Sequence, residues 1–499
     1  MNTAAALPVL IPLVLMIIMI INRSDTMARW TGVVGSLLLL ACSVFLFASV
    51  RHSGILTLQV GGWRVPFGIT LVIDLFSGLM LMAGSVVLVA VSVFSVRFIR
   101  EDCCNNRFYV FFFSLAMGMN GSLITGDLFN LFVWFEVLLL SSFVLITYGS
   151  TPQQLKGGVK YLALNLLGSL FFLAGTGLFY GKTGTLNLAH LAELMRQGEY
   201  VASLNAPAIL IFVAFGIKAA VFPLHFWLPA SYHTPNITIT SLFAGLLSKV
   251  GVYAMIRVFT LLFMHDQVFW QHLFLVVAGL TMVIGGMAAT AQYEIRRVLS
   301  YHIISQIGYM VMGLGIYTLL GIAGGLFFMI HNMLAKTAIF MVAGLIRRVK
   351  GSYDLKEIGG LYRERPFLAI LFMVPAFALA GVPPLSGFFA KFILIKAGLE
   401  DGHYWITAMA IFTAMLTLFS MIKIWNEAFL KKPPENPFDN KKSPVRLNWM
   451  DLFPPAFLGS LSILMGIFAR PVFRFTMEAA RVLTDVTPYI ESVLTGLSP

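Results

Sequence analysis

Charged side chains are scarce in this sequence: 11% of its 499 residues are Asp, Glu, Lys or Arg, whereas 59% are hydrophobic. A soluble chain of ordinary composition carries roughly 25% charged residues. Apolar stretches of about 20 residues recur from end to end, each long enough to cross a hydrocarbon layer about 30 Å thick. The composition therefore excludes an ordinary soluble enzyme. It predicts an all-α polytopic membrane protein with about 14 transmembrane helices.

Cysteine is also rare, and Cys42, Cys103 and Cys104 have neither metal-binding nor redox spacing. We therefore expect no disulfide, metal site or iron–sulfur cluster. The stretch Gly181-Lys182-Thr183 matches the end of a phosphate-binding loop, but Thr176 stands where its first glycine is required. No flavin, haem, quinone or nucleotide motif is present, so no cofactor is expected and the chain does not read as an enzyme.

The formal net charge of +12 is unevenly distributed along the chain. If the predicted helices alternate in direction, twenty Lys and Arg residues fall in connections on one side of the membrane and seven on the other. A basic excess marks the cytoplasmic side. Both termini are then expected outside. The net charge follows from membrane topology, and nucleic acid is not expected as a partner.

A few charged residues lie deep inside the predicted spans. They are Glu136, Lys218, Lys249, Lys336 and Lys391. A charge at the centre of a bilayer costs roughly 3 kcal/mol on insertion scales, so such residues usually face a water-lined pathway. Lysine also suits proton relay better than arginine, because its ammonium loses a proton more readily when buried. The series predicts a route for protons, with a Glu136–Lys218 ion pair at one end.

Other polar residues within the spans are less decisive. His331 lies five residues before Lys336 and is a further candidate for the proton pathway. His225 and His302 could equally be proton carriers or buried core residues, and Glu136 could be a neutral packing residue. Arg257, Lys396 and Lys423 lie near span ends. We expect these three to extend to the membrane surface, although Lys423 could also join the pathway.

Two predicted spans contain prolines that should interrupt a helix. Pro223 and Pro229 fall within 207–231, and Pro383 and Pro384 fall within 367–397. Proline lacks the amide donor that a helix needs, and irregular backbone at membrane depth is tolerated only inside protein or beside a wet cavity. Paired broken helices in the two halves are typical of transporters built from internal repeats. Separately, the alternating residues 51–69 predict a β-hairpin outside the membrane.

Three blocks of sequence resemble the proton-translocating antiporter-like family. This family includes the large membrane subunits of NADH:quinone oxidoreductase, related hydrogenases and Mrp cation/proton antiporters. The blocks are GIKAAVFPLHFWLPASYHTPNITITSLFAGLLSKVGVYAMIRV (216–258), RRVLSYHIISQIGYM (296–310) and ALAGVPPLSGFFAKFIL (378–394). Length and the HNMLAKTAIF run make the chain most similar to the D-type subunits of bacterial Mrp Na⁺/H⁺ antiporters.

The resemblance implies two inverted five-helix repeats, each with a broken helix. It divides the chain into N-terminal helices (1–107), a first repeat (108–264), a second repeat (272–430), and a last segment with a cytoplasmic loop, helix 14 and a tail (431–499). It places the family's glutamate at Glu136 and its lysines at Lys218, Lys249, Lys336 and Lys391. Relatives often have histidine near Gln306 and Asn332, so the order of the central relay is open.

The resemblance also implies the setting in which the chain works. The expected location is the bacterial plasma membrane, in a hetero-oligomer with A-, B-, C-, E-, F- and G-type antiporter subunits. Membrane lipid surrounds the complex, which exchanges protons for Na⁺. Two alternatives remain: a proton-pumping subunit of a redox-driven complex, and a scaffold that transports nothing.

Overall fold

The computed structural model describes residues 2–22, 24–102, 107–198, 204–263, 267–432 and 447–494. The helices of the first half are α1 (Leu7–Ile21), α2 (Asp25–Ser53), α3 (Leu75–Asp102), α4 (Arg107–Ile124), α5 (Leu128–Ile146), α6 (Pro152–Thr183), α7 (Leu188–Arg196), α8 (Asn205–Ala219), α9 (Trp227–Ser231) and α10 (Ile237–Leu262). Those of the second half are α11 (Gln267–Ala291), α12 (Ile295–Ile316), α13 (Leu319–Lys350), α14 (Leu361–Glu364), α15 (Pro366–Ala380), α16 (Ser386–Glu400), α17 (Tyr404–Trp425), α18 (Trp449–Ile467), α19 (Ala469–Thr484) and α20 (Thr487–Leu494). Cys103 and Cys104 lie outside the described residues, as does most of the predicted loop at 431–446.

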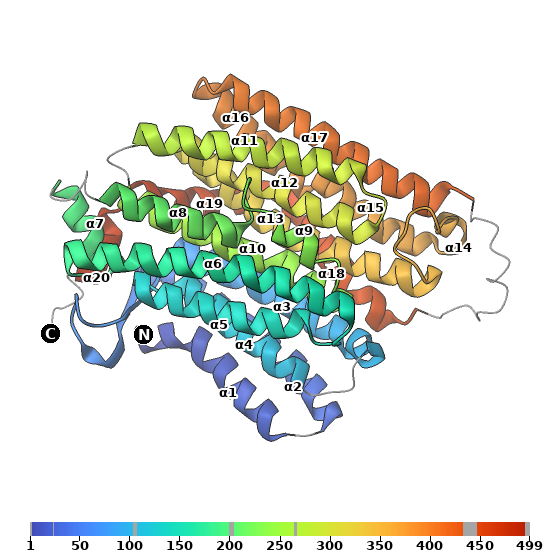
Figure 1. The fold of residues 1–499 in the computed structure, drawn as a ribbon, viewed down its shortest axis with the longest axis horizontal. Helices are drawn as coiled ribbons and strands as arrows, with labels where there is room; N and C mark the ends of the chain where they lie inside the picture. The colour runs from blue at the N-terminus through green and yellow to red at the C-terminus, as the bar shows by residue number, and fades with distance from the viewer. Residues whose placement is uncertain are drawn as a thin grey trace.

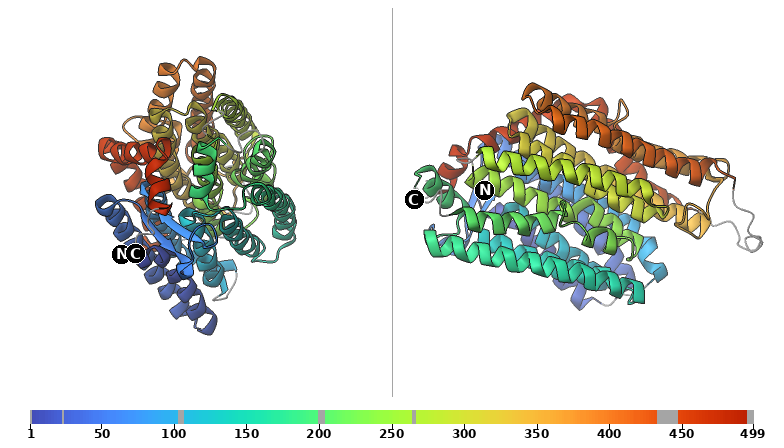
Figure 2. Two further views of the ribbon diagram at one scale, coloured as in Figure 1. Left: turned by 90° about the vertical axis from the view of Figure 1, so that its left-hand side faces the viewer. Right: turned by 45° about the horizontal axis from the view of Figure 1, so that its top comes forward.

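The long helices lie side by side along the longest axis of the molecule (Figure 1). Ten of the described helices are long and apolar enough to cross a membrane. Both termini lie at one end of the bundle, and α14 lies at the other (Figures 1 and 2). The two most buried of the ten are α10 and α13, which form the centre of the bundle. These findings confirm the predicted all-helical polytopic membrane protein.

The ends of the long helices follow from local sequence. At the start of α6, the Thr151 hydroxyl accepts a hydrogen bond from the Gln154 amide, and the Gln154 side chain accepts one from the Thr151 amide. This reciprocal pair satisfies two amides that have no partner within the helix. The helix ends at Gly184, whose φ of 68° is left-handed and suits glycine. Helix α13 is likewise capped by Thr318 at its start and by Gly351 at its end.

The predicted hairpin is present and lies slightly later in the chain than expected. Strand β1 (Leu56–Gln59) pairs antiparallel with β2 (Thr70–Ile73), with Leu56 opposite Ile73. The connection carries exposed aromatic side chains, Trp63 and Phe67. The second strand lies just beyond the predicted range of 51–69, because its alternating residues merge into the apolar run that begins α3.

The last part of the chain differs from a simple helix followed by a tail. Helix α18 ends at Ile467, and α19 continues after a bend at Phe468. Gly466 lies against the interrupted segment between α15 and α16: a Cβ there would be 2.1 Å from the Pro384 carbonyl oxygen. Beyond it, α19 packs on α13 and α3. The sequence missed α19 as a helix because its apolar residues occupy one face only.

Candidate functional site

The first broken helix positions Lys218. Helix α8 stops at Ala219, and Ala220 has a left-handed φ of 63°. The indole nitrogen of Trp227 donates to the Ile217 carbonyl at 2.8 Å and so satisfies one carbonyl at the open end. Helix α9 then begins. Pro229 lies in its first turn, where a missing amide is harmless, so the interruption predicted at Pro223 is confirmed and Pro229 adds none.

Ser169 lies between Glu136 and Lys218. Its hydroxyl donates a hydrogen bond to Oε1 of Glu136. The Lys218 ammonium donates to the same hydroxyl at 3.4 Å. Lys218 is 8% exposed, and its Nζ also lies 5.9 Å from the centre of the Phe135 ring. The two charged groups that we expected to pair directly are therefore connected through a serine on α6, which the sequence analysis did not identify.

Further along the bundle, Lys249 and Lys336 are fully buried. The Lys249 Nζ donates to the Ala244 carbonyl at 2.6 Å, and the Lys336 Nζ donates to the Leu299 carbonyl at 3.5 Å. Their helices α10 and α13 are in close contact, since a Cβ on Gly245 would lie 2.3 Å from the Thr337 hydroxyl. Both lysines therefore lie in the centre of the bundle, at adjoining helices.

The second broken helix positions Lys391. Helix α15 ends at Ala380, and Gly381 has a left-handed φ of 90°. Lys391 on α16 reaches back and donates to the carbonyls of Leu379 and Ala380, each at 2.9 Å. A cation at the carboxyl end of a helix also complements its dipole. Lys391 thus satisfies carbonyls at the open end of α15.

A short polar chain adjoins this second interruption. The Nδ1 atom of His331 lies 2.8 Å from the Ser386 hydroxyl, which lies 2.7 Å from the Ser462 hydroxyl on α18. Ser386 is the first residue of α16, two residues beyond Pro384. The predicted pathway residue His331 is therefore linked by hydrogen bonds to the broken helix.

Several buried polar groups lack a protein partner among the described residues. Both ring nitrogens of His302 are such groups, as are both side-chain polar atoms of Asn332 and the Nδ1 atom of His225. Buried groups of this kind are the usual ligands of internal water. His302 and Asn332 lie on α12 and α13, the latter carrying Lys336. Unpaired polar atoms therefore lie on the helices that surround the buried lysines.

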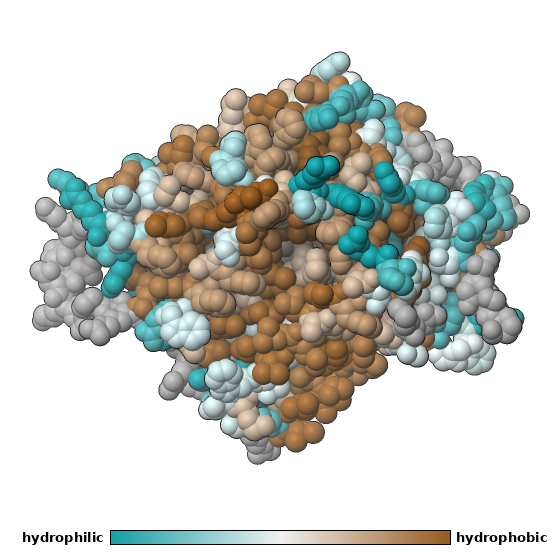
Figure 3. Space-filling view, turned by 180° about the vertical axis from the view of Figure 1, so that it is seen from behind, coloured by the Kyte–Doolittle hydropathy of each residue, from teal (hydrophilic) through white to brown (hydrophobic). Residues whose placement is uncertain are grey.

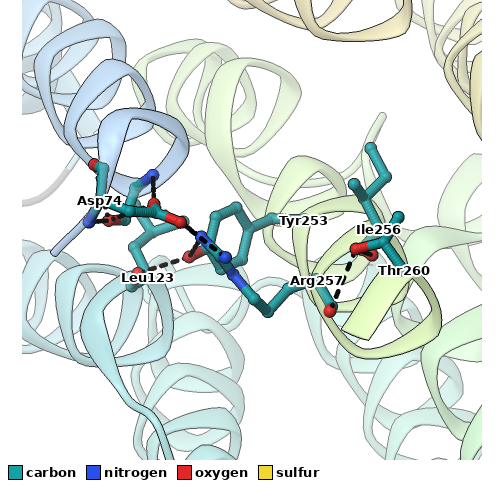
Figure 4. Close-up of polar contacts among 7 residues, drawn as sticks. Asp74, Leu123, Tyr253, Ile256, Arg257 and Thr260 are labelled. Carbon is teal, nitrogen blue, oxygen red and sulfur yellow. Dashed lines mark hydrogen bonds and ion pairs between the residues drawn. The ribbon is translucent and has the colours of Figure 1, made fainter. Parts of the chain in front are cut away.

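Arg257 does not extend to the membrane surface, so that expectation was wrong. It is 5% exposed, and its two terminal nitrogens lie 2.7 Å from the two carboxylate oxygens of Asp74 (Figure 4). The Tyr253 hydroxyl, one turn earlier, donates to the Leu123 carbonyl at 2.6 Å. Paired arginine and aspartate at adjoining helix ends are a structural tie. The sequence could not show which carboxylate would meet Arg257.

The other two basic residues near span ends differ from each other. Lys396 is exposed and lies 3.6 Å from Glu400, as a surface residue would. Lys423 donates to the carbonyls of Thr290 and Gln292 at 3.0 and 2.8 Å, and so binds the end of α11. This contact gives Lys423 a structural role whether or not protons reach it.

A cavity of about 540 Å³ lies at the end of the bundle remote from the termini. Its lining includes Lys156, Lys160, Arg297, Glu294 and His233. His233 lies in the connection between α9 and α10, where burial lowers the pKa of its ring. Its Nδ1 atom lies 2.8 Å from the Pro229 carbonyl oxygen. The cavity thus joins the surface to the segment that follows the first broken helix.

Comparison with known proteins identifies the family. Residues 125–417 match the family described as NADH:quinone oxidoreductase/Mrp antiporter. The chain is 43% identical to the D-type subunit of the Na⁺/H⁺ antiporter of Alkalihalophilus pseudofirmus, over 99% of this chain and 100% of the relative. It is 36% identical to the D-type subunit of the Na⁺/H⁺ antiporter of Bacillus subtilis, again over 99% and 100% of the two chains.

Solved structures of related complexes also resemble this chain. A chain of the Mrp complex from Dietzia matches with a TM-score of 0.91 and 29% identity, covering 99% of this chain and 100% of that one. A chain of an archaeal membrane-bound sulfane sulfur reductase matches with a TM-score of 0.90 and 27% identity, and again the match covers 99% of this chain and 100% of that one. A chain of respiratory complex I from Thermus thermophilus shares the fold, with a TM-score of 0.76 and 23% identity. This match covers 94% of this chain and 98% of that one. The chain belongs to the NADH:quinone oxidoreductase/Mrp antiporter family of membrane subunits, and within it to the D-type subunits of Mrp antiporters, which are transporter subunits and not enzymes.

Proposed function

We propose that this chain conducts protons as one subunit of a multisubunit Na⁺/H⁺ antiporter. The observation that carries the proposal is the connection from Glu136 through Ser169 to Lys218. A carboxylate and an ammonium joined by one hydroxyl can exchange a proton with little movement, because a hydroxyl both donates and accepts. Lys249, Lys336 and Lys391, with His331, continue the buried polar series through the second half of the bundle.

In this mechanism the contact between Glu136 and Lys218 opens and closes as protons load the lysines. When it opens, the Lys218 ammonium loses the nearby carboxylate that favours its charged form, and its proton moves towards Lys249. Proton flow driven by the membrane potential supplies roughly 2.3 kcal/mol per charge per 100 mV. That energy drives Na⁺ in the opposite direction.

Na⁺ is proposed to cross at another subunit or at an interface. Within the described residues there is no group of three or more His, Cys, Asp or Glu side chains that could hold a metal ion. A dehydrated hard cation prefers several oxygen ligands, carboxylates among them. The partners in this proposal are the A-, B-, C-, E-, F- and G-type subunits, and this chain alone does not exchange ions.

The proposed topology has fourteen crossings. Nine come from the long apolar helices other than α18, two from α4 and α12, and three from the pairs α8–α9, α15–α16 and α18–α19. The crossings form N-terminal helices (1–107), inverted repeats at 108–264 and 272–430, and a last part at 431–499. Both termini lie outside a bacterial plasma membrane. The shared end of the two termini in Figure 1 supports an even number of crossings.

Substitution at the ends of the first contact tests the proposal. Glu136→Ala and Lys218→Ala should each abolish Na⁺/H⁺ exchange in membrane vesicles while the complex still assembles, as measured by co-purification. Lys396→Ala is the matched control, because Lys396 is an exposed lysine near the end of a predicted span. Near-normal exchange in both of the first two variants would remove the mechanism.

A redox-driven proton pump is the second candidate. It is favoured by the 27% identity and TM-score of 0.90 to a chain of a sulfane sulfur reductase complex. Neighbouring genes for electron-transfer subunits would support it, whereas a cluster of small antiporter subunits would support exchange. A scaffold that transports nothing is the third. It predicts that replacing Glu136 and the four buried lysines together leaves exchange intact.

A further inference from the structure

Helix α19 carries a row of charged side chains on the outside of the bundle. Arg470, Arg474 and Arg481 are exposed, and their spacings of four and seven residues place them on one helix face. Arg474 pairs with Glu478 at 3.0 Å. The opposite face holds the small or apolar residues Thr476, Ala479, Ala480 and Leu483, which are buried.

The depth of this row follows from the second broken helix. Helices α15 and α16 have 15 residues each, so the interruption between them lies about 22 Å from either end of the pair. Gly466 contacts that interruption and therefore marks the middle of the membrane. At about 1.5 Å per residue, Arg470 lies roughly 6 Å beyond it and Arg474 roughly 12 Å. Both lie within a hydrocarbon half-layer of about 15 Å.

The direction of α19 is given by its contacts. Phe475 packs edge-on against Phe47 at 5.6 Å between ring centres, and Arg51 lies 4.8 Å from the Phe475 ring centre. Arg51 is two residues from the end of α2, which leads into the hairpin at the end of the bundle that holds both termini. Helix α19 therefore runs from mid-membrane towards that end, the side proposed to be outside.

The surrounding surface is apolar. Figure 3 shows the face opposite to that of Figure 1, where α19 lies, with a hydrophilic strip crossing an otherwise hydrophobic band. Leu464, Ile467 and Phe468, just before the row, are exposed large hydrophobic residues. An arginine facing lipid near mid-membrane costs roughly 3 kcal/mol. The row also lies on the side where basic residues are few, so the topology rule does not account for it.

We propose that this row is the docking surface for another membrane subunit of the same complex, one that presents carboxylate side chains at this depth. The row carries three arginines against one glutamate, with Arg51 beside it, so a complementary surface is acidic. The proposal deepens the proposed function, because it identifies where the assembly contacts this chain. It does not depend on the proton route.

Other occupants fit less well. A second copy related by a twofold axis would place the same arginines opposite one another. Acyl chains offer no hydrogen-bond acceptor, and phosphate groups of lipids lie beyond the hydrocarbon. They can meet Arg474 and Arg481, whose side chains reach the interface, but they leave Arg470, roughly 9 Å deeper than the edge of the hydrocarbon, without an acceptor. A membrane helix bearing Asp or Glu satisfies both the depth and the charge.

Photo-crosslinking in the intact complex tests the assignment. A benzophenone amino acid at position 470 or 474 should crosslink this chain to another membrane subunit of the purified complex, identified by mass spectrometry. The peptide recovered from that subunit should contain or adjoin an Asp or Glu. Crosslinks only to lipid, or only to a second copy of this chain, would overturn the proposal.

Two kinds of variant give an independent answer. Arg470→Leu with Arg474→Leu suits a lipid-facing helix, so it should leave assembly unchanged if the row faces lipid and release the partner subunit if the row docks it. Arg196→Glu is the control, since Arg196 pairs with Glu193 on the short helix α7 at the same end. Loss of co-purifying subunits from the leucine variant alone is the expected result. Glu136→Ala should do the reverse, losing exchange but keeping assembly, so the two proposals can fail separately.

Discussion

Ser169→Ala should slow exchange strongly, although serine carries no charge. Its hydroxyl has one proton to donate and two lone pairs to accept. It donates to Glu136 and accepts from Lys218, and the Asn165 carbonyl at 3.1 Å is an alternative acceptor for the same proton. Removing the oxygen separates the carboxylate from the ammonium and leaves each with one polar contact fewer.

The magnitude follows from the type of hydrogen bond. A hydrogen bond to a charged group contributes about 1.5–3 kcal/mol. The 3.4 Å contact from Lys218 is long, so we count only the bond to Glu136. Because 1.4 kcal/mol corresponds to a factor of ten, the rate of exchange should fall about 10- to 100-fold if this contact forms in the slow step.

The assay is Na⁺-dependent proton movement in inverted vesicles, normalised to the amount of assembled complex. Ser169→Thr retains a hydroxyl and should keep most of the activity. Ser141→Ala is the matched control, because Ser141 is a buried serine on α5, five residues after Glu136, whose hydroxyl bonds to the Ser114 hydroxyl and the Val137 carbonyl. Wild-type exchange by Ser169→Ala would refute the role of the hydroxyl as a bridge.

Three further predictions concern stability and pH. Asp74→Asn should destabilise the protein by about 3–5 kcal/mol, because it leaves the Arg257 guanidinium buried without a carboxylate; the measurement is the temperature at which the purified protein aggregates. Gly251→Ala should lower that temperature too, since its Cβ would lie 2.5 Å from the backbone at the end of α8, whereas Gly177→Ala, in open space, should not. His233→Gln should leave exchange at neutral and alkaline pH unchanged, because burial lowers the pKa of His233 and the ring is already neutral there. A shifted pH profile would show that His233 carries protons.

The sequence was sufficient for the class of fold and for the interrupted helices. Proline lacks the amide donor of a helix and so favours an interruption, and α8 and α15 do end before Pro223 and Pro383. Other prolines lie inside helices that continue through them, such as Pro375 in α15 and Pro454 in α18, because neighbouring groups can satisfy the freed carbonyls. Long apolar runs predicted the helical bundle because, in lipid, the backbone amides and carbonyls must form their hydrogen bonds within the protein. Pro229 did not interrupt α9, because it lies in the first turn of that helix, where its missing amide would have no partner. The sequence did not show where α9 would begin, so it could not place Pro229 in that turn.

Partners of the buried charges could not be predicted, because they come from helices distant in sequence. Ser169 is 33 residues from Glu136 and 49 from Lys218, and nothing around it distinguishes it from other serines in apolar helices. Asp74 is 183 residues from Arg257. A single sequence gives residue types and periodicity, whereas these contacts depend on which helix faces are adjacent.

The two broken helices use their lysines in different ways, and this difference bears on how the chain works. Lys218 belongs to the helix before its interruption and reaches a serine beside a carboxylate, so its charge depends on a group that can itself gain or lose a proton. Lys391 belongs to the helix after its interruption and binds two carbonyls, which cannot titrate. Loss of the Lys391 proton would leave those carbonyls with fewer donors at the open end of α15 and weaken its link to α16. In the proposed mechanism, a change of protonation at Lys218 therefore alters its interaction with the Glu136 carboxylate, whereas a change at Lys391 alters the link between α15 and α16.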